Sequence, residues 1–193
     1  MARCDAARDR LCDPAAEVSA HYLISETGEV LALVPEEMRA WHAGAGSWRG
    51  LEDVNSRSIG IELANTGAQP FAAPQMQALE ALLAGVMARW AIPPQGVIGH
   101  SDMAPGRKRD PGARFDWRRL ALGGLAVWPQ GETPQPPGGF RGDARRFGYP
   151  NVGDDLLLAA FRVRFRTWAS GPLDEVDAGI IKNLADRFGC WSP

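Results

Sequence analysis

The stretch that decides the fold of this chain is Gly99-His-Ser-Asp-Met-Ala-Pro-Gly-Arg-Lys-Arg-Asp-Pro-Gly112. Its prolines and glycines predict a fixed, turn-rich course rather than a helix. Such a loop can bring its two ends together, so His100 and Asp110, ten residues apart, are candidate ligands of one metal ion. Lys108 lies two residues before Asp110, where an ammonium group can stabilise developing negative charge on an oxygen.

Amide hydrolysis near neutral pH needs an activated water, an electrophile that holds the carbonyl oxygen and a proton shuttle to the leaving nitrogen, and zinc can supply the first two. A catalytic zinc ion uses about three ligands from His, Cys and carboxylate side chains and activates a water molecule. The best candidate general base is Glu62, because Ser58-Ile-Gly-Ile-Glu-Leu63 alternates like a strand and turns Glu62 away from its apolar face. Each residue alone has an ordinary structural interpretation, as a core histidine, a turn former or a solvated carboxylate. Their combination in one chain favours a catalytic metal site over these structural interpretations.

The elements around this loop indicate an α/β domain. Before it, a short polar helix ends near Pro14, two apolar runs form a β-hairpin, a strand carries Glu62, and an amphipathic helix follows. Val97 and Ile98 then predict a short buried strand that leads into the loop. The hairpin covers 18–34 and the helix 74–90.

The chain beyond the loop changes character twice. Residues 128–142 are rich in Pro, Gly and Gln and predict an extended linker. After them, apolar residues recur at helical spacing on two short helices, which predicts a small helical module. We therefore divide the chain into a domain at 1–127, a linker at 128–142 and a helical domain at 143–193.

Composition excludes several classes of partner. The 193 residues carry 21 Lys and Arg against 23 Asp and Glu, which argues against nucleic acid and anionic membranes as partners. The scattered Cys4, Cys12 and Cys190 give no disulfide framework. No stretch approaches the ~18 apolar residues of a transmembrane helix, and the first residues lack a signal sequence. As written we expect a monomeric cytoplasmic protein; a signal upstream would make it periplasmic or anchored to the outer membrane.

Four motifs in register resemble the type-2 N-acetylmuramoyl-L-alanine amidases, relatives of the peptidoglycan-recognition proteins. The resemblance runs from about Leu11 to Leu120 and implies a central mixed β-sheet flanked by helices, a Zn²⁺ cofactor, and cleavage of the amide between the N-acetylmuramoyl lactyl group and L-Ala in peptidoglycan or muropeptides. It gives metal-ligand roles to His100 and Asp110, the acid/base role to Glu62 and a transition-state role to Lys108. The motifs are Leu-Cys-Asp-Pro-Ala-Ala-Glu-Val-Ser-Ala-His-Tyr-Leu-Ile, Arg-Ala-Trp-His-Ala-Gly, Asn-Ser-Arg-Ser-Ile-Gly-Ile-Glu-Leu and the loop at 99–112.

The resemblance extends to the tail and stops short at the N-terminus. Residues 143–193 look like the small peptidoglycan-binding-type domain of the lipoprotein branch. The third zinc ligand of the family is a histidine on a first strand that should precede Met1, so the chain begins some ~25 residues late by this comparison. We therefore expect this chain to bind zinc poorly and to be nearly inactive.

The remaining histidines and the rival functions complete the sequence hypotheses. His21 lies in a strand and is expected to be structural, whereas His42 and Asn55 are candidate substrate-binding residues. One alternative is a non-catalytic muropeptide-binding protein that has lost its metal site. Another is a docking platform that acts through the C-terminal module.

Overall fold

The structure is a computed structural model that describes residues 4–131 and 133–189, so Cys190 lies outside the described residues. The chain forms two compact units. The first comprises the chain up to Ala45 together with Asp53–Ile92, and the second comprises Gly46–Glu52 with the chain from Pro93 onward. These bounds differ from the division at 128–142, which stays a prediction.

The first unit contains the predicted mixed sheet. Its central strand β1 (Tyr22–Ile24) pairs antiparallel with β2 (Val30–Ala32) and parallel with β3 (Ile61–Leu63), which gives the order β2-β1-β3. The hairpin and the strand that carries Glu62 are thus confirmed. The α/β class with a mixed sheet is confirmed as well.

Helices accompany this sheet, as expected from their apolar spacing. α1 (Cys4–Cys12) is followed by the 3-10 turn η1 (Pro14–Ala16), and η2 (Val54–Ser56) precedes β3. α2 (Ala73–Trp90) starts with a proline in its first turn and ends at Ala91 in the left-handed conformation, close to the predicted 74–90. Its buried residues include Met76, Leu79, Leu83 and Val86.

A buried amide fixes α2 to the sheet. The Gln75 side chain is fully buried, and its nitrogen donates hydrogen bonds to the carbonyl oxygens of Ile24 (3.0 Å) and Ala64 (3.2 Å). These carbonyls lie at the end of β1 and just after β3. The polar residue in an otherwise apolar helix face therefore satisfies backbone groups at the strand ends.

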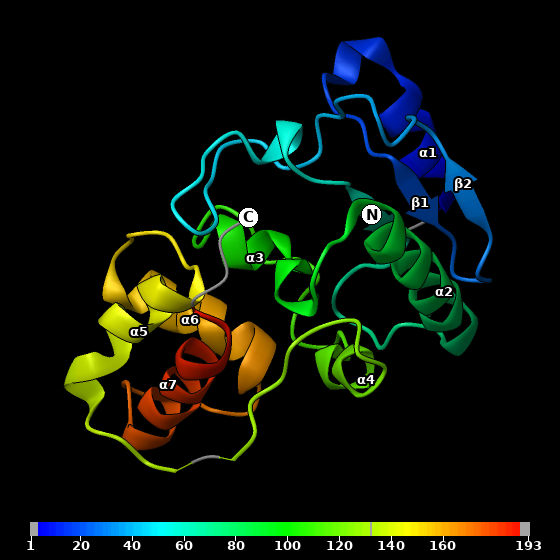
Figure 1. Ribbon diagram of the computed structural model, residues 1–193. Coiled ribbons are helices and arrows are strands. Elements are labelled where there is room, and N and C mark those ends of the chain that lie inside the picture. The colour runs from blue at the N-terminus through cyan, green and yellow to red at the C-terminus, as the bar shows by residue number, and fades with distance from the viewer. Residues whose placement is uncertain (1–3, 132, 190–193) are drawn as a thin grey trace. The chain divides into compact units, whose positions relative to one another are not determined.

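The second unit is helical. In Figure 1 its green to red part contains α3 (His100–Met103), α4 (Trp117–Leu122), α5 (Phe140–Phe147), α6 (Asp154–Phe165) and α7 (Glu175–Phe188); the 3-10 turns η3 (Pro94–Gly96) and η4 (Pro137–Gly139) lie between them. α6 and α7 confirm the two predicted helices, whereas α5 was not predicted. The core is aromatic: Phe161 packs with Phe140 and Phe165, with ring centroids 5.3 and 5.6 Å apart.

A short segment from the first half of the chain is built into this unit. The Trp48 ring packs edge-on against Phe147 and Tyr149, with centroids 5.7 and 5.4 Å away. Arg49 donates from its backbone to the Gly148 carbonyl (2.8 Å) and from its guanidinium to the Phe188 carbonyl. A Cβ at Gly148 would lie 2.8 Å from the Trp48 ring, so this position requires glycine.

One sequence expectation needs correction. The predicted strand at Val97 and Ile98 is wrong: both residues lie in irregular chain and are only partly buried. The Val97 carbonyl accepts a hydrogen bond from Arg164, a partner that short-range sequence patterns do not reveal.

The predicted linker is irregular as far as residue 136 where it is described, and it makes hydrogen bonds to α7. Gln130 and Asn183 exchange two hydrogen bonds (2.9 and 3.1 Å), and the Gln135 N–H donates to the Glu175 carbonyl (2.9 Å). The segment therefore lies along α7.

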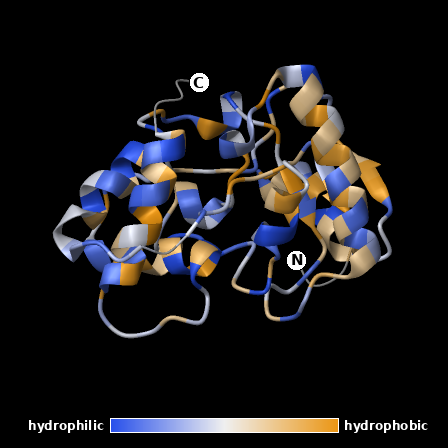
Figure 2. Ribbon diagram, turned by 60° about the horizontal axis from the view of Figure 1, so that its bottom comes forward, coloured by the Kyte–Doolittle hydropathy of each residue, from blue (hydrophilic) through white to orange (hydrophobic). Residues whose placement is uncertain are grey.

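Hydrophobic and hydrophilic residues are interspersed along the helices of both units (Figure 2). Within the described residues, we find no helix with the length and apolar character needed to cross a bilayer.

Candidate active site

The signature loop brings His100 and Asp110 together. Helix α3 begins at His100, so the start of the loop is one turn of helix rather than the turn-rich chain we predicted. The His100 Nδ1 atom contacts the Asp110 Oδ2 atom, and next to them the Ser101 N–H donates to the Asp110 carbonyl (3.0 Å). The two ends of the loop are thus closed by a side-chain and a backbone contact.

The environment of Asp110 keeps its carboxylate ionised. Burial would raise the pKa of Asp110, but the hydrogen bond from His100, the charge of that ring and the charge of Lys108 outweigh it, and the pKa is lowered. An ionised carboxylate beside an imidazole is a donor pair that suits zinc.

This pair supplies two side chains of the kinds that zinc takes as ligands. Among the described residues, no group of three or more His, Cys, Asp and Glu side chains is placed to hold a metal ion. The donor types at His100 and Asp110 fit zinc, but the number of protein ligands falls below the usual three.

The other predicted site residues divide between the two units. Lys108 belongs to the second unit, where its N–H donates to the Ala104 carbonyl (3.0 Å) at the tight turn after α3. Glu62 belongs to the first, as the partly buried middle residue of β3, opposite Leu23 of β1. The structure thus places each on the predicted element, and their catalytic roles stay predictions.

His42 and Asn55 are brought together in the first unit. The Asn55 side-chain oxygen accepts hydrogen bonds from the backbone N–H groups of His42 (3.0 Å) and Ala43 (2.8 Å). The His42 ring lies over Gly60, where an added Cβ would be 2.3 Å from it. Asn55 and Gly60 therefore shape the loop that carries His42. This structural role is separate from the predicted contact of Asn55 with substrate.

His21 is a structural residue, as expected. Its side chain is buried, with 1% exposure. Nδ1 accepts from the Gly60 N–H (2.9 Å), which leaves Nε2 as the donor to the Met38 carbonyl (3.0 Å). Because both ring nitrogens are used, His21 cannot serve as the third zinc ligand without breaking these bonds.

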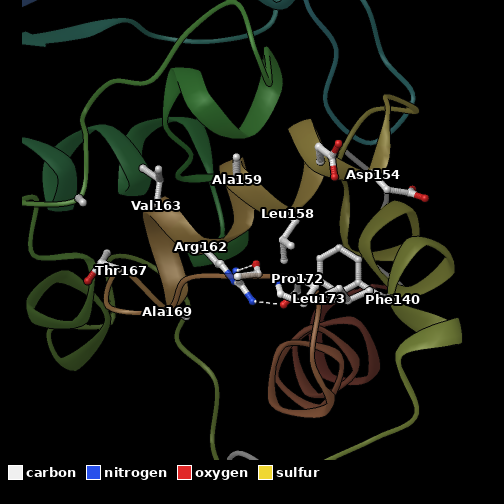
Figure 3. A pocket seen from close by; sticks show the side chains of 13 residues that line it. Phe140, Asp154, Leu158, Ala159, Arg162, Val163, Thr167, Ala169, Pro172 and Leu173 are labelled. Atoms are coloured by element: carbon white, nitrogen blue, oxygen red, sulfur yellow. Dashed lines mark hydrogen bonds between the residues drawn. The ribbon is translucent and has the colours of Figure 1, made fainter.

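A separate cavity of about 490 Å³ lies in the second unit. Figure 3 shows side chains of α6, including Leu158, Ala159 and Val163, on its walls and Arg162 near the Pro172 loop. Arg162 donates to the carbonyls of Gly171 (2.7 Å) and Pro172 (2.9 Å) and pairs with Asp177. Its charge is therefore neutralised within the protein.

The fold and the His–Asp pair define a mixed α/β protein with a metal-type donor pair in a Pro- and Gly-rich loop. The family model for N-acetylmuramoyl-L-alanine amidases matches residues 1–113. AmiD of Escherichia coli (strain K12), an N-acetylmuramoyl-L-alanine amidase, is 34% identical over 209 residues, which cover 90% of this chain and 75% of AmiD. The chain belongs to the N-acetylmuramoyl-L-alanine amidase family.

Further relatives place it within that family. The 1,6-anhydro-N-acetylmuramyl-L-alanine amidase AmpD of Enterobacter cloacae is 44% identical over 103 residues, 53% of this chain and 55% of AmpD, so the match covers about half of that relative. The solved complex of E. coli AmiD with anhydro-N-acetylmuramic acid-L-Ala-D-gamma-Glu-L-Lys superposes with a TM-score of 0.88 at 34% identity and covers 96% of this chain and 85% of AmiD. AMPDH3 of Pseudomonas aeruginosa with anhydromuramic pentapeptide gives 0.84 at 30% identity, over 95% of this chain and 87% of that one.

Proposed function

We propose that this chain hydrolyses the amide between the N-acetylmuramoyl lactyl group and L-Ala in muropeptides or peptidoglycan. The observation that carries the proposal is the contact between His100 and Asp110 in the signature loop. The names of the amidase relatives and the two solved complexes with anhydromuramic peptides support it.

We propose zinc as the metal of this pair, with His100 and Asp110 as its ligands. When bound, zinc supplies a Lewis acid and a water of lowered pKa. Glu62 is proposed to carry the proton to the leaving nitrogen, and Lys108 to stabilise negative charge on the carbonyl oxygen. Because the described residues offer two of about three ligands, the chain should hold zinc weakly.

The test is peptide release from an anhydro-N-acetylmuramoyl tripeptide, followed by chromatography and mass spectrometry while Zn²⁺ is titrated. We expect release to be low without added zinc and to rise to a plateau with it, because excess ion fills a weak site. His100→Ala and Asp110→Ala should each lower the plateau by about 100-fold or more. Tight stoichiometric zinc with full turnover would refute the weak site.

A second candidate is a protein that binds muropeptides without cleaving them. It is favoured by the incomplete donor set in the described part of the chain. Calorimetric binding of the same tripeptide at saturating zinc, with no peptide released, would establish this binder in place of the amidase.

A further inference from the structure

A buried ion pair lies beside the signature loop, and it uses a residue of the C-terminal helices. Arg164 of α6 donates to the Asp102 carboxylate of α3 (2.6 Å), and the two side chains are 1% and 0% exposed. The same guanidinium donates to the Val97 carbonyl (3.2 Å) and lies 4.0 Å from the centre of the Trp117 ring. One side chain of α6 therefore joins three points of the segment 97–117.

The Asp102 carboxylate accepts hydrogen bonds from three different residues. Besides Arg164, it accepts hydrogen bonds from the Tyr149 hydroxyl (2.8 Å) and from the Gly99 N–H (2.9 Å). Burial and the charge of Asp102 raise the pKa of Tyr149 well above its usual value, so the phenol stays protonated and donates. A buried carboxylate with these partners is fixed in place.

The contacts of Asp102 hold the backbone on both sides of His100 in the sequence. Asp102 follows His100 within the same helical turn, and Gly99, which Asp102 binds, precedes it directly. A Cβ at Gly99 would lie 2.7 Å from the Pro111 ring, so the backbone here packs tightly on the Asp110 end of the loop. The Ser101 N–H makes the cross-loop bond to Asp110.

A second buried ion pair shows what a purely structural pair looks like in the same unit. Arg162, also on α6, pairs with Asp177 of α7 and binds the loop at Gly171 and Pro172. None of these partners belongs to the signature loop. Arg162 and Arg164 are thus buried arginines two residues apart, and of the two it is Arg164 that binds the segment that carries His100.

We propose that Arg164 and Tyr149 are positioning residues that act through Asp102 to hold His100 against Asp110. The consequence for catalysis rests on the proposed amidase function, whereas the consequence for loop geometry does not. The C-terminal helices are then a structural part of the site rather than only a module for wall binding.

The experiment compares Arg164→Met and Tyr149→Phe with the matched control Arg162→Met in the full chain. Amide hydrogen exchange at Ser101 is measured by NMR in each variant, and global stability is measured by denaturation and subtracted. We expect Arg164→Met to speed Ser101 exchange at least about 10-fold beyond its effect on stability, and to weaken Co²⁺ binding about 10–100-fold. Arg162→Met should lose stability without either effect.

Turnover gives an independent readout. Arg164→Met should lower kcat about 10–100-fold with KM little changed, and Arg164→Lys, which keeps the charge, should recover part of that loss. If Arg164→Met fails to fold, Tyr149→Phe, which loses a single hydroxyl, carries the test with a smaller effect of the same sign. Equal Ser101 exchange in the Arg164, Tyr149 and Arg162 variants would overturn the proposal. If neither the unsubstituted protein nor any variant shows turnover, but Ser101 exchange still differs between the Arg164 and Arg162 variants, only the amidase function is refuted.

Discussion

At the scale of single residues, the signature loop with His100 and Asp110 is held by a buried arginine that lies far along the chain. His100 and Asp110 could be predicted because they belong to one short motif. Asp102 lies in the same motif, yet its partner Arg164 is 62 residues away, and a charge in an amphipathic helix usually indicates a solvated face. Burial of that arginine depends on tertiary packing, which no local pattern encodes.

Substitution of His21 tests whether this histidine has a structural role or is a zinc ligand. His21→Ala removes an acceptor from the Gly60 N–H and a donor from the Met38 carbonyl in a buried place. We expect the free energy of unfolding to fall by roughly 2–4 kcal/mol, with zinc binding unchanged at temperatures where the variant is folded. Denaturant titration and a zinc titration measure the two quantities. Loss of zinc affinity without loss of stability would make His21 a ligand.

Substitution of Asn55 should loosen the loop that carries His42. Asn55→Ala removes the acceptor for the N–H groups of His42 and Ala43, so amide exchange at both should speed up about 10-fold, since a lost hydrogen bond is worth about 1–1.5 kcal/mol. Asn55→Asp keeps an acceptor oxygen and serves as the control. Slow exchange at both amides in Asn55→Ala would leave only the substrate-contact role.

At the scale of elements, periodic segments were predicted well and contact-dependent ones were not. The hairpin, α2, α6 and α7 carry clear apolar spacing. The segment at Val97 and Ile98 is apolar but pairs with no strand within the part of the chain that the structure describes, and the Val97 carbonyl accepts a hydrogen bond from Arg164 instead. α5 has three arginines and few apolar residues among its 8 positions, and it is a helix because Phe140, Ala144 and Phe147 are buried on one side.

A hydrogen-bonded cluster around the Glu36 carboxylate links the sheet to α2 and should make the first unit sensitive to acid. Glu36 accepts hydrogen bonds from Arg89, Trp90 and the Tyr22 hydroxyl, and Arg89 above all lowers the pKa of Glu36 to about 2. A carboxyl group with a lowered pKa in the folded state stabilises above its unfolded pKa of 4.5 and loses this contribution as pH falls towards 2.

The acid sensitivity can be measured by comparing the stability of the wild type with that of the Glu36→Gln variant. The difference in unfolding free energy between wild type and variant should be constant above about pH 5 and shrink steadily below it. Urea titrations from pH 2 to pH 7 measure it. Parallel curves for the two proteins over the whole range would show that Glu36 is not held ionised.

At the scale of the whole molecule, the domain division at 128–142 stays a prediction. Composition predicted an extended linker there, but composition does not tell whether such a segment contacts its neighbours, and here Gln130 binds Asn183 of α7. The second unit instead includes the signature loop together with the C-terminal helices. Contacts between distant residues, rather than local composition, define it.

Removal of residues 143–193 should therefore damage the signature loop. The shortened chain loses Arg164 and Tyr149, and we expect zinc-dependent peptide release to fall about 100-fold or more and proteases to cut within 97–117. The control is hydrogen exchange in β1, which lies in the first unit and should stay protected. Unchanged activity would show that the signature loop does not need the C-terminal helices, and unchanged wall binding would remove the docking platform from consideration.

The Trp48 segment sets an order of events during synthesis. Its partners Phe147, Tyr149 and Phe188 emerge from the ribosome about a hundred or more residues later, so these contacts have high contact order and form late. Arg164 also follows His100 by 64 positions. A nascent chain can thus complete the sheet early while the support of its His–Asp pair waits for nearly the last helix.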